Sequence, residues 1–266
     1  RAVVIGRSTL VGLPIALLAG LSLVMLPPGA QAQVQASAPA DTGMFLIFDH
    51  ATPIAHERHA YQNMGDSLLI TAATERTFVD EKGQRVVFRK TMLLVVDARD
   101  LGLMHYLSNQ DFNGHKVVRG LLPTDTVMTF YNEYDDVGSA DRVVQPPGRL
   151  FVLDPQLFTL FDVLCRSLAG KNFETRRVQL VALGADSLTT PMAIVTMGKP
   201  DTLRLGGRRV PTRHYTIDDH GVQFEVWADA RGRMLSLKHE PSGLAVERVP
   251  DAPAASAPRR RNPGQR

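Results

Sequence analysis

Three histidines lie close together in the first third of the chain, at His50, His56 and His59. Imidazole nitrogens bind zinc, and the zinc-protease motif places two histidines at i and i+4 on one helical face. His56 and His59 are only three positions apart, with Glu57 and Arg58 between them, so the spacing excludes that motif. In a strand the two rings would point to opposite faces. We therefore favour surface histidines or a structural Glu57 buried with Arg58 nearby, and we expect no metal site.

Two further candidates for chemistry fail on their sequence context. Asp41-Thr42-Gly43 matches the aspartic-protease triplet, but it follows Ser37 to Ala40 rather than a buried apolar strand, and the chain has no second copy. Cys165 is the only cysteine, so no disulfide within the chain is possible. It lies in an apolar helical pattern, which favours a small buried hydrophobic residue over a nucleophile.

Other catalytic and cofactor signatures are missing from the sequence. There is no nucleophile elbow, no P-loop and no dinucleotide fingerprint. Asp135, Asp136 and Asp141 could attract calcium but lack the glycine and glutamate of a calcium loop, which favours a solvated acidic loop. Trp227 could stack on a ligand or could simply pack. We predict a protein that is not an enzyme and has no cofactor and no metal; an enzyme of unrecognised type stays open.

The elements that would position these residues are mostly strands. Apolar residues make up 44% of the chain and charged residues 21%, which is typical of a globular domain. Period-two alternation runs through most of it, and short turn signals separate the alternating segments. The pattern predicts a large antiparallel meander with strands over 44–49, 54–61, 67–79, 85–96, 103–109, 117–122, 127–131, 177–183, 193–197, 214–217, 222–227, 234–238 and 244–249.

One segment has helical spacing instead. Asp154 and Pro155 open it as N-cap and first helical residue, and Gly170 closes it. The helix is therefore predicted over about 154–169. Its apolar face is broad, so it should pack on the concave face of the curled sheet. The predicted fold class is mainly β: an antiparallel meander curled into a half-barrel with one helix.

The two ends of the chain differ from this body. Arg1 and Arg7 precede an apolar run from Leu10 to Leu26, and a small-residue site follows it, so residues 1–32 are predicted to be a secretory signal peptide. Residues 33–42 are predicted as a flexible leader, 43–249 as a single β-rich half-barrel domain and 250–266 as a disordered tail rich in arginine and proline. We therefore expect an exported, periplasmic or secreted protein with no stable membrane span after cleavage.

The net charge of +3 does not indicate nucleic-acid binding. Two arginines lie in residues 1–32 and four in residues 251–266, and the body between these ends has a small excess of acidic residues. Affinity for nucleic acid needs clustered cations that neutralise phosphates. We expect no nucleic-acid partner.

Four short segments resemble those of exported bacterial domains of unknown function. They are Gly43-Met44-Phe45-Leu46-Ile47, Pro53-Ile54-Ala55-His56-Glu57, Phe151-Val152-Leu153-Asp154 and Trp227-Ala228-Asp229-Ala230-Arg231-Gly232-Arg233-Met234-Leu235. Over residues 43–249 the order of the expected elements is similar to that in a broad group of half-barrel folds, which includes the carriers LolA and LppX. The resemblance implies an antiparallel half-barrel that holds a helix over an apolar cavity. It carries over no ligand-binding residue.

The concave face can be a filled core or a pocket, and this choice sets the function. Methionines are frequent on the predicted inner faces, at Met44, Met92, Met104, Met128 and Met197, and they suit either reading. The first hypothesis is a non-catalytic binding protein for a lipid or another apolar or amphipathic ligand. The second is a structural or interaction module of the cell envelope with a protein partner. The candidate ligand-binding residues are Phe45, Ile47, Ile70, Phe88, Met92, Leu94, Met128, Leu157, Phe161 and Leu164.

Overall fold

The computed structural model describes residues 41–183 and 192–250, and these contain one 15-stranded sheet, one α-helix and one short 3-10 helix. The predicted signal peptide, most of the leader and the tail after Pro250 lie outside the described residues. The first strand begins at Asp41, so the last two residues assigned to the leader belong to the sheet. The elements are β1 (Asp41–Asp49), β2 (Thr52–Asn63), β3 (Ser67–Val79), β4 (Arg85–Asp97), β5 (Leu103–Phe112), β6 (His115–Pro123), β7 (Val127–Tyr134), β8 (Val137–Val144), β9 (Leu150–Leu153), α1 (Thr159–Leu168), β10 (Thr175–Ala182), β11 (Met192–Leu205), β12 (Arg208–Asp219), β13 (Val222–Ala228), β14 (Met234–His239), η1 (Glu240–Ser242) and β15 (Leu244–Arg248).

The predicted antiparallel meander is confirmed, with two features that the sequence did not indicate. Strand β1 pairs with β15, and this pairing joins a meander of β1–β8 to a second one made of β10–β15. Strand β9 pairs with β10 in parallel. A parallel pair needs a crossover connection, and α1 lies in the chain between these two strands. The sheet therefore ends at β8 on one edge and at β9 on the other.

Strand β8 is missing from the sequence prediction because its turn was read as an acidic loop. Asp135 and Asp136 both have left-handed backbones, with φ of 46° and 68°. Two successive positive φ values are typical of the tight turn that matches the twist of a hairpin, usually built from asparagine and glycine. The two aspartates therefore connect β7 to β8 directly, and they mark no cation site.

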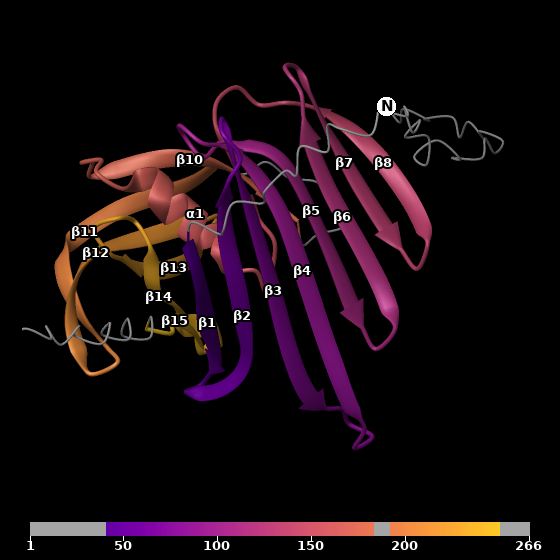
Figure 1. Ribbon diagram of the computed structural model, residues 1–266, viewed down its shortest axis with the longest axis horizontal. Coiled ribbons are helices and arrows are strands. Elements are labelled where there is room, and N and C mark those ends of the chain that lie inside the picture. The colour runs from indigo at the N-terminus through magenta and orange to yellow at the C-terminus, as the bar shows by residue number, and fades with distance from the viewer. Residues whose placement is uncertain (1–40, 184–191, 251–266) are drawn as a thin grey trace, which may run out of the picture. The chain divides into compact units, whose positions relative to one another are not determined.

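The sheet curls around α1 (Figure 1), and the helix separates the core into two clusters of buried residues. Phe161, Leu164 and Leu168 pack against β1 and strands β10–β15. Leu160 and Val163, on another side of the helix, pack with strands β2–β7 and β9. Burial on two sides explains why the apolar face of this segment is so broad. The predicted half-barrel with one helix on its concave face is confirmed.

The helix is shorter than predicted. It begins at Thr159, and the five residues 154–158 form a turn in which Gln156 has a φ of 71°. Asp154 does not cap the helix because its carboxylate is bound by side chains of the sheet. No helix within the described ranges is long and apolar enough to cross a membrane.

Candidate ligand-binding cavity

The turn over residues 154–158 is fixed to the concave face of the sheet by Glu57. This glutamate is fully buried on β2, and its carboxylate accepts hydrogen bonds from the backbone N–H groups of Phe158 and Thr159, both at 2.7 Å. The hydroxyls of Thr159 and Thr74 also donate to it. Burial raises the pKa of Glu57, and these four hydrogen bonds act against that rise. Glu57 thus replaces the missing N-cap side chain and places a carboxylate at the positive end of the helix.

A second buried group holds the start of the same turn. The Lys90 ammonium donates to the Asp154 carboxylate and to the Pro155 carbonyl, the latter at 2.8 Å. Tyr106 and Ser108 donate to the other oxygen of Asp154 at 2.5 and 2.8 Å. Burial lowers the pKa of Lys90, and the negative charge of Asp154 opposes this shift. Every bond of this group joins strands β4 and β5 to the turn, so its role is to anchor the turn.

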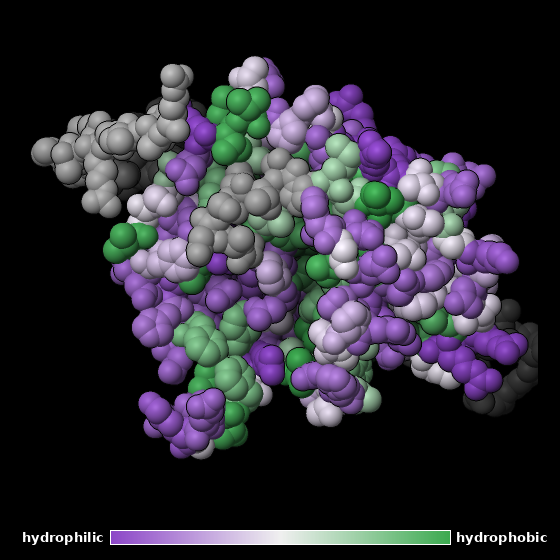
Figure 2. All heavy atoms as spheres, turned by 180° about the vertical axis from the view of Figure 1, so that it is seen from behind, coloured by the Kyte–Doolittle hydropathy of each residue, from purple (hydrophilic) through white to green (hydrophobic). Residues whose placement is uncertain are grey.

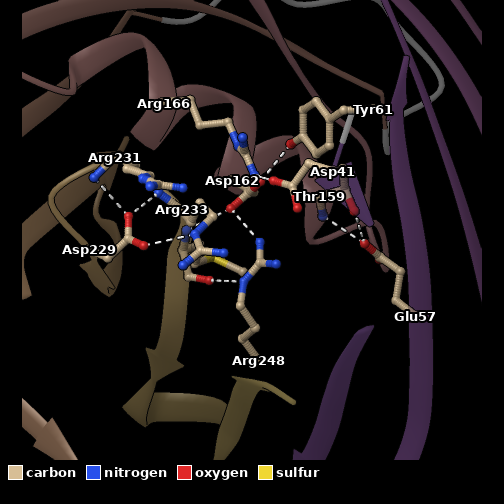
Figure 3. A network of polar contacts seen from close by, with 11 residues as sticks. Asp41, Glu57, Tyr61, Thr159, Asp162, Arg166, Asp229, Arg231, Arg233 and Arg248 are labelled. Carbon is tan, nitrogen blue, oxygen red and sulfur yellow. Dashed lines mark hydrogen bonds and ion pairs between the residues drawn. The ribbon is translucent and has the colours of Figure 1, made fainter. Parts of the chain in front are cut away.

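Helix α1 carries a third buried carboxylate, Asp162 (Figure 3). It accepts hydrogen bonds from the Tyr61 hydroxyl at 2.5 Å, the Arg166 Nε at 2.8 Å and the Arg248 Nη2 at 2.9 Å. The Met234 backbone N–H donates to it at 2.6 Å. Burial alone raises the pKa of Asp162, but the two guanidinium groups outweigh burial and hold this pKa below its usual range. The helix is thereby tied to β2, β14 and β15.

An apolar cavity of about 510 Å³ opens beside the anchored turn. Its walls come from the ends of β1–β4 on one side and of β12, β13 and β15 on the other, and the turn and α1 form its roof. The volume lies within the range of about 300–1,000 Å³ that is common for small-molecule sites. The apolar side chains that line it are Ile47, Ile54, Ala55, Phe88, Leu153, Pro155, Leu157, Phe158, Phe161, Ala182, Leu183, Val222, Phe224 and Leu244.

The structure divides the ten sequence-predicted ligand-binding residues between the cavity and the core. Ile47, Phe88, Leu157 and Phe161 line the cavity. Phe45 and Leu164 are buried in the cluster between α1 and strands β10–β15. Ile70, Met92, Leu94 and Met128 are buried in the other cluster. Of the five methionines expected to face inward, Met104 is instead 46% exposed, and Met44 lies on the outer face of β1, next to the inward-facing Phe45.

Sequence reasoning missed the wall contributed by the C-terminal strands. Val222, Phe224 and Leu244 line the cavity, but they are about 170 to 200 residues away in the chain from Ile47 and Ile54. The pairing of β1 with β15, in which Asp49 lies opposite Leu244, brings them together. Alternation along a strand shows which residues share a face, but it does not show which distant strand will lie next to it. The sequence signal available for this wall was the partly apolar alternation of the residues near Phe224.

The residues considered above for metal binding, nucleophilic catalysis or ligand stacking make packing and hydrogen-bond contacts within the folded chain. His56 and His59 lie on opposite faces of β2, and His59 is buried against the Phe45 ring. No cluster of three or more metal-ligating side chains occurs in the part of the chain that the structure describes. Cys165 is buried, and burial raises the pKa of its thiol well above the usual range. Trp227 stacks on His214 with 4.8 Å between ring centroids, and its indole N–H donates to Asp201 at 3.0 Å.

A second, larger cleft of about 870 Å³ lies at the other end of β9. Its walls include Asp97, Asp100, Arg149, Arg176 and Arg177, and Arg149 is paired with Asp100 at 2.9 Å. This cleft is larger than the apolar cavity but is much more polar. We take the apolar cavity as the candidate site because its walls are the more apolar of the two, so it removes more of an apolar ligand's surface from contact with polar groups and water.

Comparisons with known proteins give fold likenesses only. No protein-family model matches the sequence, and no curated protein matches it either. A solved structure described as a β-barrel-like protein of a domain of unknown function, DUF1849, from Brucella abortus is similar with a TM-score of 0.49 and 10% identity. The match covers 78% of this chain and 94% of that one. A DUF1089 family protein from Pseudomonas aeruginosa is similar with a TM-score of 0.41 and 12% identity, covering 67% of this chain and 87% of that one.

Proposed function

We propose that this chain is an exported, non-catalytic binding protein that holds an apolar or amphipathic, lipid-like ligand in the cavity beneath the 154–158 turn. The observation that carries this proposal is the 510 Å³ apolar cavity itself. Export is proposed from the sequence of residues 1–32. The resemblance to the LolA and LppX carriers belongs to the same proposal and adds the expectation of a lipid-like ligand.

Two features support a binding role for the cavity. The turn that roofs it is held by buried polar groups on β2, β4 and β5, so contacts within the chain position the roof without a ligand. A preformed site avoids the entropic cost of ordering on binding. In addition, hydrophobic atoms are visible inside a furrow that runs between hydrophilic flanks (Figure 2). Apolar surface within the curl of the sheet is therefore reachable from solvent.

The test combines the native ligand with a designed block of the cavity. Native mass spectrometry and lipid extraction, applied to the chain purified from its own envelope, should recover an apolar molecule. In parallel, binding of the neutral fluorophore N-phenyl-1-naphthylamine should be titrated. Ala55→Trp places an indole in the cavity and should raise the Kd of the fluorophore by at least about tenfold, because the tryptophan occupies the ligand's space.

Ala73→Trp is the matched control, since Ala73 is exposed on the outer face of the adjacent strand β3. It should leave fluorophore binding unchanged, and circular dichroism should show that both variants are folded. The proposal fails if the purified chain carries no apolar molecule and does not bind the fluorophore. It also fails if the Ala55→Trp and Ala73→Trp variants bind the fluorophore equally well.

The second candidate is an interaction module of the cell envelope, and the free edge of the sheet favours it. Within residues 41–183 and 192–250 strand β8 has one neighbour, and Val137 and Val144 at its ends are 76% and 84% exposed. An unpaired strand edge can accept a strand from another chain. For this function Val144→Lys should abolish partner binding, whereas Ala55→Trp should leave it intact.

A further inference from the structure

The charged groups that line the apolar cavity are Arg76, Asp154 and Asp219, and His239 lines it as well. Asp154 is paired with Lys90. Asp219 lies 3.0 Å from the His220 ring, and the Nδ1 of His239 is 2.7 Å from the Ser242 hydroxyl. Arg76 also lines the cavity, and within residues 41–183 and 192–250 it has no carboxylate within ion-pair distance. Its guanidinium lies over the Phe78 ring, 5.2 Å from the centroid.

Arg76 stands where the roof of the cavity ends. Two residues earlier on the same face of β3, Thr74 is 4% exposed, and its hydroxyl shares its proton between Glu57 and the Gln156 carbonyl of the turn, at 3.1 and 2.9 Å. Toward the hairpin tip, Arg76 and the next residue on that face, Phe78, are only half-buried. The neighbours of Arg76 across the sheet are Ala55 on β2 and Phe88 on β4, and both line the cavity. The guanidinium is therefore half-buried in apolar surroundings at the boundary between the cavity and the open part of the concave face.

A half-buried cation without a counter-ion has lost part of its hydration, and the contact of the Arg76 guanidinium with the Phe78 ring supplies no hydrogen-bond acceptor in its place. An anionic group next to it would restore a charge-assisted hydrogen bond, and a guanidinium can bind a carboxylate or a phosphate through two parallel bonds. The apolar cavity beside Arg76 is unsuited to an anionic group but can hold a hydrocarbon chain. Arg76 thus suits the anionic head group of an amphiphile, and the apolar cavity suits the hydrocarbon tail of the same molecule.

We infer that the ligand is an anionic amphiphile whose carboxylate, phosphate or sulfate binds Arg76 and whose apolar chain fills the cavity toward Leu157 and Phe161. This inference rests on the proposed function and specifies its ligand class. Arg76 is then the residue that determines specificity for the head group. The other cavity-lining residues determine only that the tail is apolar.

The test uses a series of twelve-carbon ligands that share a tail and differ in the head group. Dodecanoate, dodecyl phosphate, dodecan-1-ol and dodecyltrimethylammonium should each be titrated against N-phenyl-1-naphthylamine bound to the full chain, below their micelle concentrations. The wild-type chain should bind dodecanoate and dodecyl phosphate about tenfold or more tightly than dodecan-1-ol. Arg76→Gln should remove this preference without weakening dodecan-1-ol, and Arg76→Lys should restore part of it.

Arg58→Gln is the control, because Arg58 is an exposed arginine on the outer face of the adjacent strand β2. It should keep the wild-type preference. The inference is overturned if the wild-type chain binds dodecan-1-ol as tightly as dodecanoate, or if the Arg76→Gln variant keeps the preference for anionic head groups. In either case, binding of dodecan-1-ol would still support the proposed function. Inorganic phosphate that competes as well as dodecyl phosphate would show a free-anion site and would also overturn it. Failure of every twelve-carbon ligand and of the fluorophore would remove the proposed function itself.

Discussion

At the scale of single residues, the inner face of β2 carries two buried polar side chains with opposite surroundings. Glu57 has a donor for each of its carboxylate oxygens. His59 is 4% exposed, and neither of its ring nitrogens has a hydrogen-bond partner within the described residues. Burial lowers the pKa of His59 to about 4, Arg248 and Arg166 add to this shift, and Asp162 and Asp41 oppose it. The folded chain therefore keeps this imidazole neutral.

The lowered pKa of His59 predicts a loss of stability in mild acid. In the unfolded chain His59 titrates near 6.5, so between about pH 6.5 and 4 the unfolded state binds the proton and the folded state does not. The free energy of unfolding should therefore fall as the pH decreases through this window, by up to about 3 kcal/mol from this residue. Urea unfolding at pH 7, 5.5 and 4 measures the decrease.

His59→Gln removes the titrating group and should flatten that part of the pH profile. His56→Gln, on the half-exposed opposite face of the same strand, is the control and should keep the wild-type slope. An identical slope in wild type and His59→Gln would show that His59 is solvated in the folded chain.

At the scale of elements, the polar groups of the sheet stabilise the turn that precedes the helix. Residues 154–158 do not form the first turn of α1: the Asp154 side chain is bound to Lys90, Tyr106 and Ser108, and the backbone of Gln156 is left-handed. The helix then has no N-cap of its own, and Glu57 supplies one from β2. These long-range bonds position both the roof of the cavity and the helix. Removing Glu57 or Lys90 should therefore destabilise the roof and the helix together.

Lys90 and Arg89 are adjacent on β4 but face opposite sides, and they provide a matched pair of substitutions. Lys90→Met leaves the buried Asp154 charge with only the more distant Arg119, at 3.9 Å, as a cation, and it should cost up to about 3–5 kcal/mol of unfolding free energy. Arg89→Met breaks an exposed contact with Glu75 at 3.5 Å and should cost about 0–1 kcal/mol. Chemical denaturation measures both values.

The double variant Lys90→Met with Asp154→Asn tests the reason for that cost. It removes both charges together, so it should be more stable than Lys90→Met alone. If the double variant were less stable than Lys90→Met, packing around the lysine stem rather than the uncompensated charge would explain the loss.

At the scale of the whole sheet, stability should be uneven because the sheet is open. Among the described residues strand β8 pairs only with β7, and most of its residues are exposed. Strands β1, β14 and β15 lie in the middle of the strand order and contribute Phe45, Leu237 and Val246 to the buried core. Local opening requires little loss of buried surface at an edge and much more at the centre.

Native-state hydrogen exchange should follow this order. The amides of residues 137–144 should exchange fastest among the strands, and those of β1, β14 and β15 should exchange slowest. Peptide-resolved mass spectrometry measures the rates. Protection of β8 equal to that of β1 would contradict an open edge and would indicate that another chain covers it.

The sequence alone determined the local structure of the chain. Alternation predicted thirteen of the fifteen strands, and helical spacing predicted the helix, because both patterns depend only on which residues share a face. It also correctly favoured a structural Glu57 and a buried Cys165. Four of the ten candidate site residues lie at the cavity, since an inward-facing apolar residue cannot be assigned to core or pocket without knowing what packs against it.

The tertiary structure decided everything that depends on contacts between distant segments. The pairing of β1 with β15 places Leu244 opposite Asp49 and closes the cavity. Glu57 reaches the helix across about 100 residues of chain, and Lys90 reaches Asp154 across 64. Such contacts are selected by the total burial and hydrogen bonding of the folded chain rather than by local pattern. The position of Arg76 at the edge of an apolar cavity, which specifies the ligand we infer, follows from those contacts.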